Sequence, residues 1–160
     1  MDIEKIKPRL SYDPITGAFT WIKPRAGIRV GAHAGHVSQE GYVHLGIAGK
    51  TIKAHRLAWL LTHGGLPEII DHINGNRADN RIANLRAVTA SQNRMNAAPR
   101  SDSKSRTKGV SWAAREGKWN AQIHVDGKKK FLGYFVEFEA AKVAYEKASK
   151  QYHGEFARAG

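Results

Sequence analysis

The sequence contains no cysteine. This absence excludes disulfide bonds, thiolate zinc sites and cysteine nucleophiles, and it fits a reducing compartment. Long apolar runs are missing as well: no stretch is long enough to span a bilayer, and Met1–Lys5 lacks the apolar run of a signal peptide. We therefore expect a soluble, cytoplasmic protein.

Acidic residues are scarce. The chain has 26 lysines and arginines against 14 aspartates and glutamates, which gives a formal net charge of +12. Such an excess of positive charge points to a polyanionic partner. No basic amphipathic helix with a large apolar face stands out, so nucleic acid fits better than an anionic membrane surface.

The chain has room for one ordinary domain or two small ones, since it has 160 residues. Residues Ala97–Ser105 read A-A-P-R-S-D-S-K-S, a composition typical of linkers. We place the domain boundary there. The expected N-terminal domain covers residues 1–97, the linker 98–105 and the C-terminal domain 106–160.

Local signals divide the N-terminal domain into short elements. Alternating apolar residues and turn residues predict strands at residues 18–22, 42–47 and 50–52. A short helix is expected at 3–10, and a longer one with one apolar face at 53–63, ended by Gly64. The remaining segments are expected to be a turn at Tyr12–Gly17 and an irregular basic loop at 23–41.

The stretch from Ile70 to Asn96 is crowded with polar side chains and gives few residues to a core. We expect a strand at 69–73, a turn at Asn74-Gly75, a polar loop and then a helix. Thr89 and Gln92 match a capping box and mark the start of that helix. We interpret His55, on the preceding helix, as a histidine packed against this stretch.

Two adjacent residues of the stretch suit phosphodiester hydrolysis, which needs a base for the attacking water and a Lewis acid for the leaving oxygen. His72 is a suitable base, because an imidazole titrates near neutral pH. Asp71 points to the opposite side of the strand and, with an oxygen of Asn93, offers two ligands to a cation. Magnesium accepts so few protein ligands because it keeps waters and uses substrate phosphates.

The spacing of the polar residues in this stretch can also be compared with that of other metal-binding or structural loops. An EF-hand is excluded, because Gly75 comes one residue early and Ile82 stands where the glutamate ligand belongs. A zinc site is disfavoured by the lack of thiols and of a close histidine pair. On spacing alone, an asparagine-rich loop held by side chain–backbone hydrogen bonds, with no chemistry, stays open.

Several short motifs together resemble the HNH endonucleases of phages and mobile introns. Over residues 10–97 they are Tyr12-Asp13-Pro14-x-Thr16-Gly17, Gly41-Tyr42, Ala54–Trp59, Asp71–Asn76, Asp79-Asn80-Arg81, Asn84-Leu85-Arg86 and Gln92-Asn93. The resemblance implies a ββα-metal (His-Me finger) domain with one divalent ion. It assigns water activation to His72, ion binding to Asp71 and Asn93, and the bracing of the loop that orients His72 to Asn84. Many relatives carry histidine in place of Asn93, and a neutral oxygen ligand suits magnesium or manganese better than zinc.

The C-terminal domain has a different pattern. Strand-like runs at 108–114, 118–125 and 130–136 are separated by turn residues, and a helix with small residues on one face follows at 137–153. This predicts a three-stranded antiparallel sheet plus a helix. Alternation should turn Trp119, Ala121, Ile123 and Val125 toward the helix, and Gln122 and His124 outward. Trp112 and Trp119 are expected to be buried.

Residues 105–157 are similar to the AP2 DNA-binding domain, through Lys108-Gly109-Val110, Lys118-Trp119, Leu132-Gly133, Ala140-Ala141 and Gly154–Ala157. That family lays its sheet in the major groove. The resemblance therefore implies a DNA-binding face made of Lys108, Arg115, Gln122, His124, Lys129 and Phe131. Ser111 and Ala113 stand where plant members carry guanine-reading arginines, which favours contacts to the DNA backbone.

The sequence thus predicts an α+β protein in which an HNH nuclease domain is followed by an AP2-like module. We expect an endonuclease of a phage or mobile element that depends on Mg²⁺ (or Mn²⁺) and cuts double-stranded DNA, as a monomer or weak homodimer. The alternative is a non-catalytic DNA-binding regulator with a degenerate nuclease half. The intact set of Asp71, His72, Asn84 and Asn93 argues against that alternative.

Overall fold

A computed structural model describes residues 6–23, 27–47, 49–99 and 103–157 of the chain. The chain forms two compact units, residues 1–88 and 89–160. Each is described here by itself. None of the helices in the described part combines the length and the hydrophobicity that a bilayer-spanning segment requires.

In its described residues, the first unit consists of three small antiparallel sheets, one α-helix and a short 3₁₀ helix at Ile82–Asn84. In one sheet β1 (Leu10–Tyr12) pairs with β2 (Phe19–Trp21), and in the second β4 (Val43–Ile47) lies between β3 (His36–Val37) and β5 (Lys50–Lys53). The third pairs β6 (Ile69–His72) with β7 (Leu85–Val88), and α1 is Ala54–His63. The core gathers side chains from β2, β4 and α1, of which Phe19, Leu45 and Leu57 are fully buried.

Most of the elements expected in this unit are confirmed. The strands predicted at 18–22, 42–47 and 50–52 are β2, β4 and β5, and the predicted helix at 53–63 is α1. Gly64 ends α1 in the left-handed conformation, and its N–H donates to the Leu60 carbonyl. The expected loop at 23–41 contains the short strand β3, and its residues 24–26 lie outside the described part.

Two expectations for this unit were wrong. The described part of the predicted helix at 3–10 is a turn that leads into β1, because Leu10 pairs with Trp21 across the sheet. The polar loop expected before the second helix ends in a strand, β7, which aligns Arg86 with Asp71 and Leu85 with His72. Pairing with β6 turns this four-residue segment, which has little strand signal of its own, into a strand.

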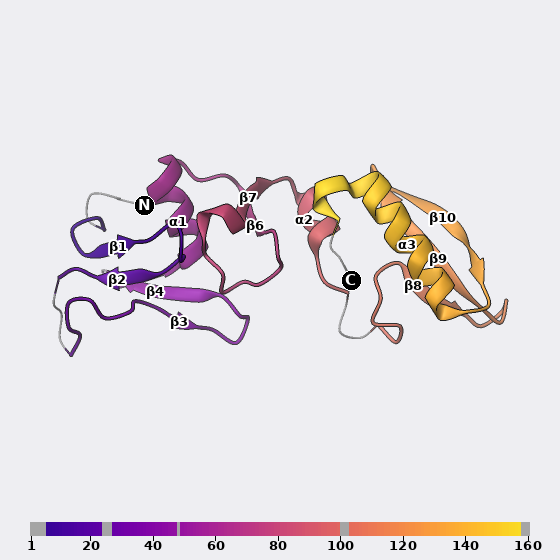
Figure 1. Cartoon of the computed structure of the whole chain (residues 1–160), viewed down its shortest axis with the longest axis horizontal. Helices are drawn as coiled ribbons and strands as arrows, with labels where there is room; N and C mark the ends of the chain where they lie inside the picture. The colour runs from indigo at the N-terminus through magenta and orange to yellow at the C-terminus, as the bar shows by residue number, and fades with distance from the viewer. Residues whose placement is uncertain (1–5, 24–26, 48, 100–102, 158–160) are drawn as a thin grey trace. The chain divides into compact units, whose positions relative to one another are not determined.

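The second unit contains α2 (Ala90–Asn96), the antiparallel strands β8 (Val110–Ala113), β9 (Lys118–Val125) and β10 (Lys128–Phe135), and α3 (Phe138–His153). The strand order is β10-β9-β8, and α3 runs across one face of the sheet (Figure 1). The three predicted strands and the predicted helix are confirmed. Their core consists of Val110, Ala121 and Ile123 from the sheet and Ala141, Tyr145 and Ala148 from α3.

Trp112 is a correction to the expected core of this unit. Its side chain is 52% exposed, whereas Trp119 is half-buried, as expected. Trp112 lies on the edge strand β8 and meets Trp119 edge-to-face, with ring centroids 5.3 Å apart. An edge strand has a neighbouring strand on one side only. The side of the Trp112 indole that faces away from β9 therefore stays open to solvent.

The compact units divide the chain at Val88/Thr89, ahead of the linker at 98–105 where we expected the domain boundary. One reason is that Lys108 ties α2 to the second unit. Its ammonium donates to the carbonyls of Arg94, Met95 and Ala97 at the end of α2, where free carbonyls attract a cation.

The turn at Tyr12–Gly17 packs against the loop between β6 and β7. A substitution at Gly17 can test how much this packing contributes to stability. A methyl group at Gly17 would lie 2.5 Å from the Arg81 nitrogen, and Gly17 has a φ of +75°. Gly31 has a similar φ of +84° but open space around it. We expect Gly31→Ala to cost about 1 kcal/mol for its backbone conformation. Gly17→Ala should cost roughly 2 kcal/mol more because of the overlap. Urea unfolding of both variants measures the difference; equal losses would mean that the close approach is unimportant.

Candidate active site

Strand β6 delivers Asp71 and His72 to a buried position. Asp71 lies opposite Arg86 in the β6–β7 ladder, and its Oδ2 accepts hydrogen bonds from Arg86 Nε at 3.1 Å and Nη2 at 2.9 Å. Both side chains of this ion pair are largely buried. The charge of Asp71 is therefore balanced within the first unit by a guanidinium from the neighbouring strand.

His72 lies among aromatic rings. Its side chain is only 4% exposed, and its ring meets that of His55 edge-to-face with centroids 5.0 Å apart. Tyr42, from the end of the loop before β4, packs on both: its ring centroid is 5.2 Å from that of His55 and 6.0 Å from that of His72. The packing expected for His55 is thus confirmed, and α1 supplies one wall of the site.

Burial controls the charge state of both histidines. The pKa of His72 is lowered, chiefly because burial disfavours the imidazolium, although the Asn80 side chain and the Asp71 charge act in the opposite direction. Burial and the neighbouring His72 lower the pKa of His55 to about 3. His55 is consequently neutral at physiological pH. A neutral His72 retains the lone pair that a general base requires.

Asn84 closes the loop between β6 and β7. Its Oδ1 accepts from the Asn74 backbone N–H at 3.0 Å, and its Nδ2 donates to Asn74 Oδ1 at 3.0 Å and to the Asp79 carbonyl at 2.9 Å. Its own carbonyl accepts from the Ile73 N–H at 2.9 Å. One side chain thereby fixes both ends of the loop directly after His72.

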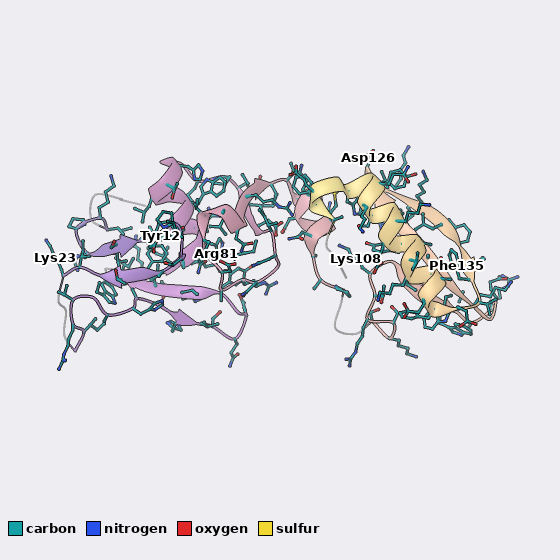
Figure 2. The ribbon with its side chains drawn as sticks, viewed as in Figure 1. Tyr12, Lys23, Arg81, Lys108, Asp126 and Phe135 are labelled. Carbon is teal, nitrogen blue, oxygen red and sulfur yellow. The ribbon has the colours of Figure 1, made fainter. Side chains whose placement is uncertain are left out.

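The far part of the loop is held by charge and by a residue distant in sequence. Arg81 donates to both carboxylate oxygens of Asp79, at 2.8 and 2.6 Å, and this guanidinium lowers the pKa of Asp79 to about 2. Asn80 is buried, and its carbonyl accepts from the Tyr12 hydroxyl at 2.8 Å. Figure 2 labels Arg81, which lies in this loop, and Tyr12, which lies at the end of β1.

Four residues at this site were given no role from the sequence, or a packing role only: Tyr12, Tyr42, His55 and Asn80. All four occur within the short motifs that carry the HNH resemblance. Their place in these motifs was the sequence feature that could have marked them as part of the site. Their contacts with the loop and with His72 depend on tertiary packing, which no local pattern encodes.

Asn93, the second predicted metal ligand, lies in α2 of the second unit and is exposed. The capping box at the start of α2 is confirmed: Thr89 accepts from the Gln92 N–H, and the Gln92 side chain accepts from the Thr89 N–H. The pairing of Asn93 with Asp71 stays a prediction. No group of three histidine or carboxylate side chains among the described residues is arranged to hold a metal ion.

The predicted DNA-binding residues fall into two groups. Gln122, His124, Lys129 and Phe131 belong to the sheet face opposite α3, and the register places Phe131 beside Gln122 and Lys129 beside His124. Arg115 is exposed in the turn between β8 and β9. Lys108 differs, because its ammonium binds the carbonyls at the end of α2 (Figure 2 labels it).

Residues 53–95, which run from the end of β5 into α2 and include Asp71, His72, Asn84 and Asn93, match the family model described as HNH endonuclease. This segment of the chain is therefore similar to HNH endonucleases. The Tyr12–Gly17 turn and strands β8–β10 lie outside the matched segment. The family match supports nuclease function in general, whereas the AP2-like nature of the second unit stays a prediction.

Two individual proteins are similar to this chain. Protein 3.8 of Escherichia phage T7 is 28% identical over 111 residues, which covers 68% of this chain and 91% of that protein. A solved structure of the HNH homing endonuclease I-HmuI, described as binding and cleaving DNA, is 26% identical. That match covers 82% of this chain and 75% of the other, with a TM-score of 0.47.

The low pKa of His55 leads to a prediction about the stability of the first unit. Because the folded pKa of about 3 lies below the usual 6.5, the stabilisation is fully present above pH 6.5 and is lost as the pH falls toward 3. Between pH 7 and pH 5 the free energy of unfolding should drop by about 2 kcal/mol through this group. Urea unfolding at both pH values should show a smaller drop in His55→Gln. The exposed His63, on the same helix, provides the control His63→Gln, which should behave as wild type; equal drops in all three proteins would contradict the prediction.

Proposed function

We propose that this protein is a metal-dependent endonuclease that hydrolyses phosphodiester bonds of double-stranded DNA. The observation that carries the proposal is the arrangement around His72: within a segment that matches the HNH endonuclease family, a buried imidazole stands next to Asp71 and directly before a loop closed by Asn84. The plain alternative is an inert asparagine-rich loop held by side chain–backbone hydrogen bonds, with no chemistry.

In this proposal His72 accepts a proton from the attacking water. A general base must be unprotonated at the working pH and fixed in direction. Burial keeps the imidazole neutral, while the His55 and Tyr42 rings and the Asn84-closed loop limit its rotation. Asn84 acts through the loop, as a positioning residue.

The divalent ion is proposed to bind at Asp71 and Asn93. A carboxylate and an amide supply oxygen donors, which suit Mg²⁺ or Mn²⁺. Two protein ligands leave most of the coordination shell to water and to DNA phosphate, so binding of the ion should be weak without DNA. When bound, the ion would supply positive charge beside the leaving oxygen. Arg86 already contacts Asp71 Oδ2, so the carboxylate would have to serve both partners.

DNA binding is proposed to rest on the positive charge of the chain and on the outward sheet face of the second unit. The formal net charge of +12 favours a phosphate backbone as partner. Arg115, Gln122, His124, Lys129 and Phe131 are the proposed contacts. A monomer with one active site would nick one strand, and a weak homodimer could cut both.

One observation favours a different function, a non-catalytic DNA-binding regulator. Arg86 binds the carboxylate that the nuclease needs for its metal ion, and an ion pair of this kind can be purely structural. Incubation of supercoiled plasmid with the protein and Mg²⁺ separates the two functions. Cutting that EDTA stops supports the nuclease; binding without any cutting supports the regulator.

A substitution at His72 sharpens this test. His72→Ala should reduce the cleavage rate by about a hundredfold to ten-thousandfold, the usual contribution of a positioned base. Affinity for DNA should stay within about twofold, because His72 is buried and contributes no phosphate contact. Cleavage is followed on gels and binding by fluorescence anisotropy without metal. A parallel loss of both would assign His72 a structural role.

The salt dependence of binding tests the proposed DNA face. Lys129→Ala should flatten the slope of log affinity against log salt concentration by about 0.9, the loss of one phosphate contact. Lys108→Ala provides the comparison, since its ammonium already binds three carbonyls. It should lower the unfolding temperature and leave the salt slope unchanged. The reverse result would place Lys108, and not Lys129, against the DNA.

A further inference from the structure

Strand β10 contains an irregularity that changes which side chains face solvent. Its register with β9 shifts between Phe131 and Gly133, which is the effect of a β-bulge. In a regular strand, residues three apart point to opposite faces. Here Phe131 and Tyr134 meet edge-to-face with ring centroids 5.0 Å apart, so the bulge turns both rings to the same face.

Gly133 fixes the bulge. Its φ is +143°, a conformation that other residues rarely adopt, and a methyl group there would lie 3.2 Å from the Phe135 ring. The bulge has a second effect on the opposite face, where Leu132 and Phe135 both pack into the core beneath α3. The sequence Phe-Leu-Gly-Tyr-Phe thus places two aromatic rings outside and two apolar side chains inside.

The outer pair is unusually exposed for large aromatic side chains. Phe131 is 57% exposed and Tyr134 48%. Amides stand directly beside them, because the register pairs Phe131 with Gln122 and Tyr134 with Asn120. Exposed apolar rings rimmed by polar side chains are typical of a binding surface.

The charge around this face is of one sign. Strands β8, β9 and β10 contain no acidic residue, and they carry Lys118, Lys128, Lys129 and Lys130. Lys130 is engaged with Tyr152, whose hydroxyl and ring it contacts, whereas Lys129 lies beside His124 on the outer face. The partner that complements this surface is a polyanion with flat apolar groups.

We propose that this face binds unpaired nucleotides, with bases stacking on Phe131 and Tyr134, the amide of Gln122 contacting base edges, and Lys129 contacting phosphate. In an intact duplex each base is covered by its neighbours, and a groove-binding ring reaches little beyond a thymine methyl. Bases that have left the stack expose the flat faces to which aromatic rings bind without regard to sequence. The inference rests on the proposed function, because it specifies the feature of the double-stranded substrate that this face binds most tightly: a locally opened stretch.

The experiment compares two DNAs of equal length and charge, a perfect duplex and the same duplex with a central mismatched bubble that contains 2-aminopurine. Affinities of the full chain are measured in EDTA, so that no cleavage occurs. We expect the bubble to bind at least about tenfold more tightly than the duplex. The protein should also quench the fluorescence of 2-aminopurine in the bubble, because stacking on a ring quenches it.

Single substitutions then assign the effect. Phe131→Ala and Tyr134→Ala should each remove about fivefold or more of the bubble affinity, and should lower duplex affinity by a clearly smaller factor. Phe131→Tyr should keep the preference, since the ring is retained. Val143 on α3 is also apolar and 59% exposed, so Val143→Ala serves as the matched control and should change neither affinity.

Equal affinity for bubble and duplex would overturn the inference, and so would an equal loss on both DNAs in the Phe131 and Tyr134 variants. The result is separable from the proposed function. A protein that cuts plasmid and binds duplex, but shows no preference for the bubble, refutes this inference alone. A protein that binds neither DNA refutes both.

Discussion

The candidate site depends on one hydrogen-bonded closure, the Asn84 side chain across the loop between β6 and β7. Each such hydrogen bond contributes only about 1 kcal/mol net. Loss of the amide, however, would leave the Asn74 N–H and the Asp79 carbonyl half-buried without this partner, and unsatisfied groups cost more than the bonds contribute. The loop leaves β6 directly after His72, so the direction of the imidazole follows from this closure.

A second closure comes from the opposite end of the first unit. The Tyr12 hydroxyl binds the Asn80 carbonyl, and Gly17 approaches the Arg81 backbone too closely for any side chain. These contacts join segments 68 residues apart in sequence. The family match begins only at residue 53, yet the loop inside it is held from outside. The segment that matches the family model is therefore not self-contained, because N-terminal residues outside it hold its loop in place.

Local signals predicted much of this structure. The capping box at Thr89, the helix ended by Gly64 and strand β9 follow from residue pattern alone. The failures share a physical cause. Strand β7 exists because Arg86 and Leu85 pair with β6, the turn at 6–9 is set by the pairing of Leu10 with Trp21, and the exposure of Trp112 follows from its place on an edge strand. Each depends on a partner distant in sequence. The contact between Tyr12 and Asn80 was out of reach for the same reason.

Charge is used differently in the two units, and this difference bears on how binding and chemistry divide. At the candidate site, arginines form ion pairs with carboxylates of the same unit: Arg86 with Asp71, and Arg81 with Asp79. The charges near His72 are thus largely paired, and burial keeps its imidazole uncharged by lowering its pKa. In the second unit the sheet strands have lysines and no acidic residue, so their field is not cancelled locally. An uncharged imidazole can accept a proton, whereas positive charge that no acidic neighbour cancels favours phosphate binding. The two tasks therefore rest on different residues, and a change to one can leave the other intact.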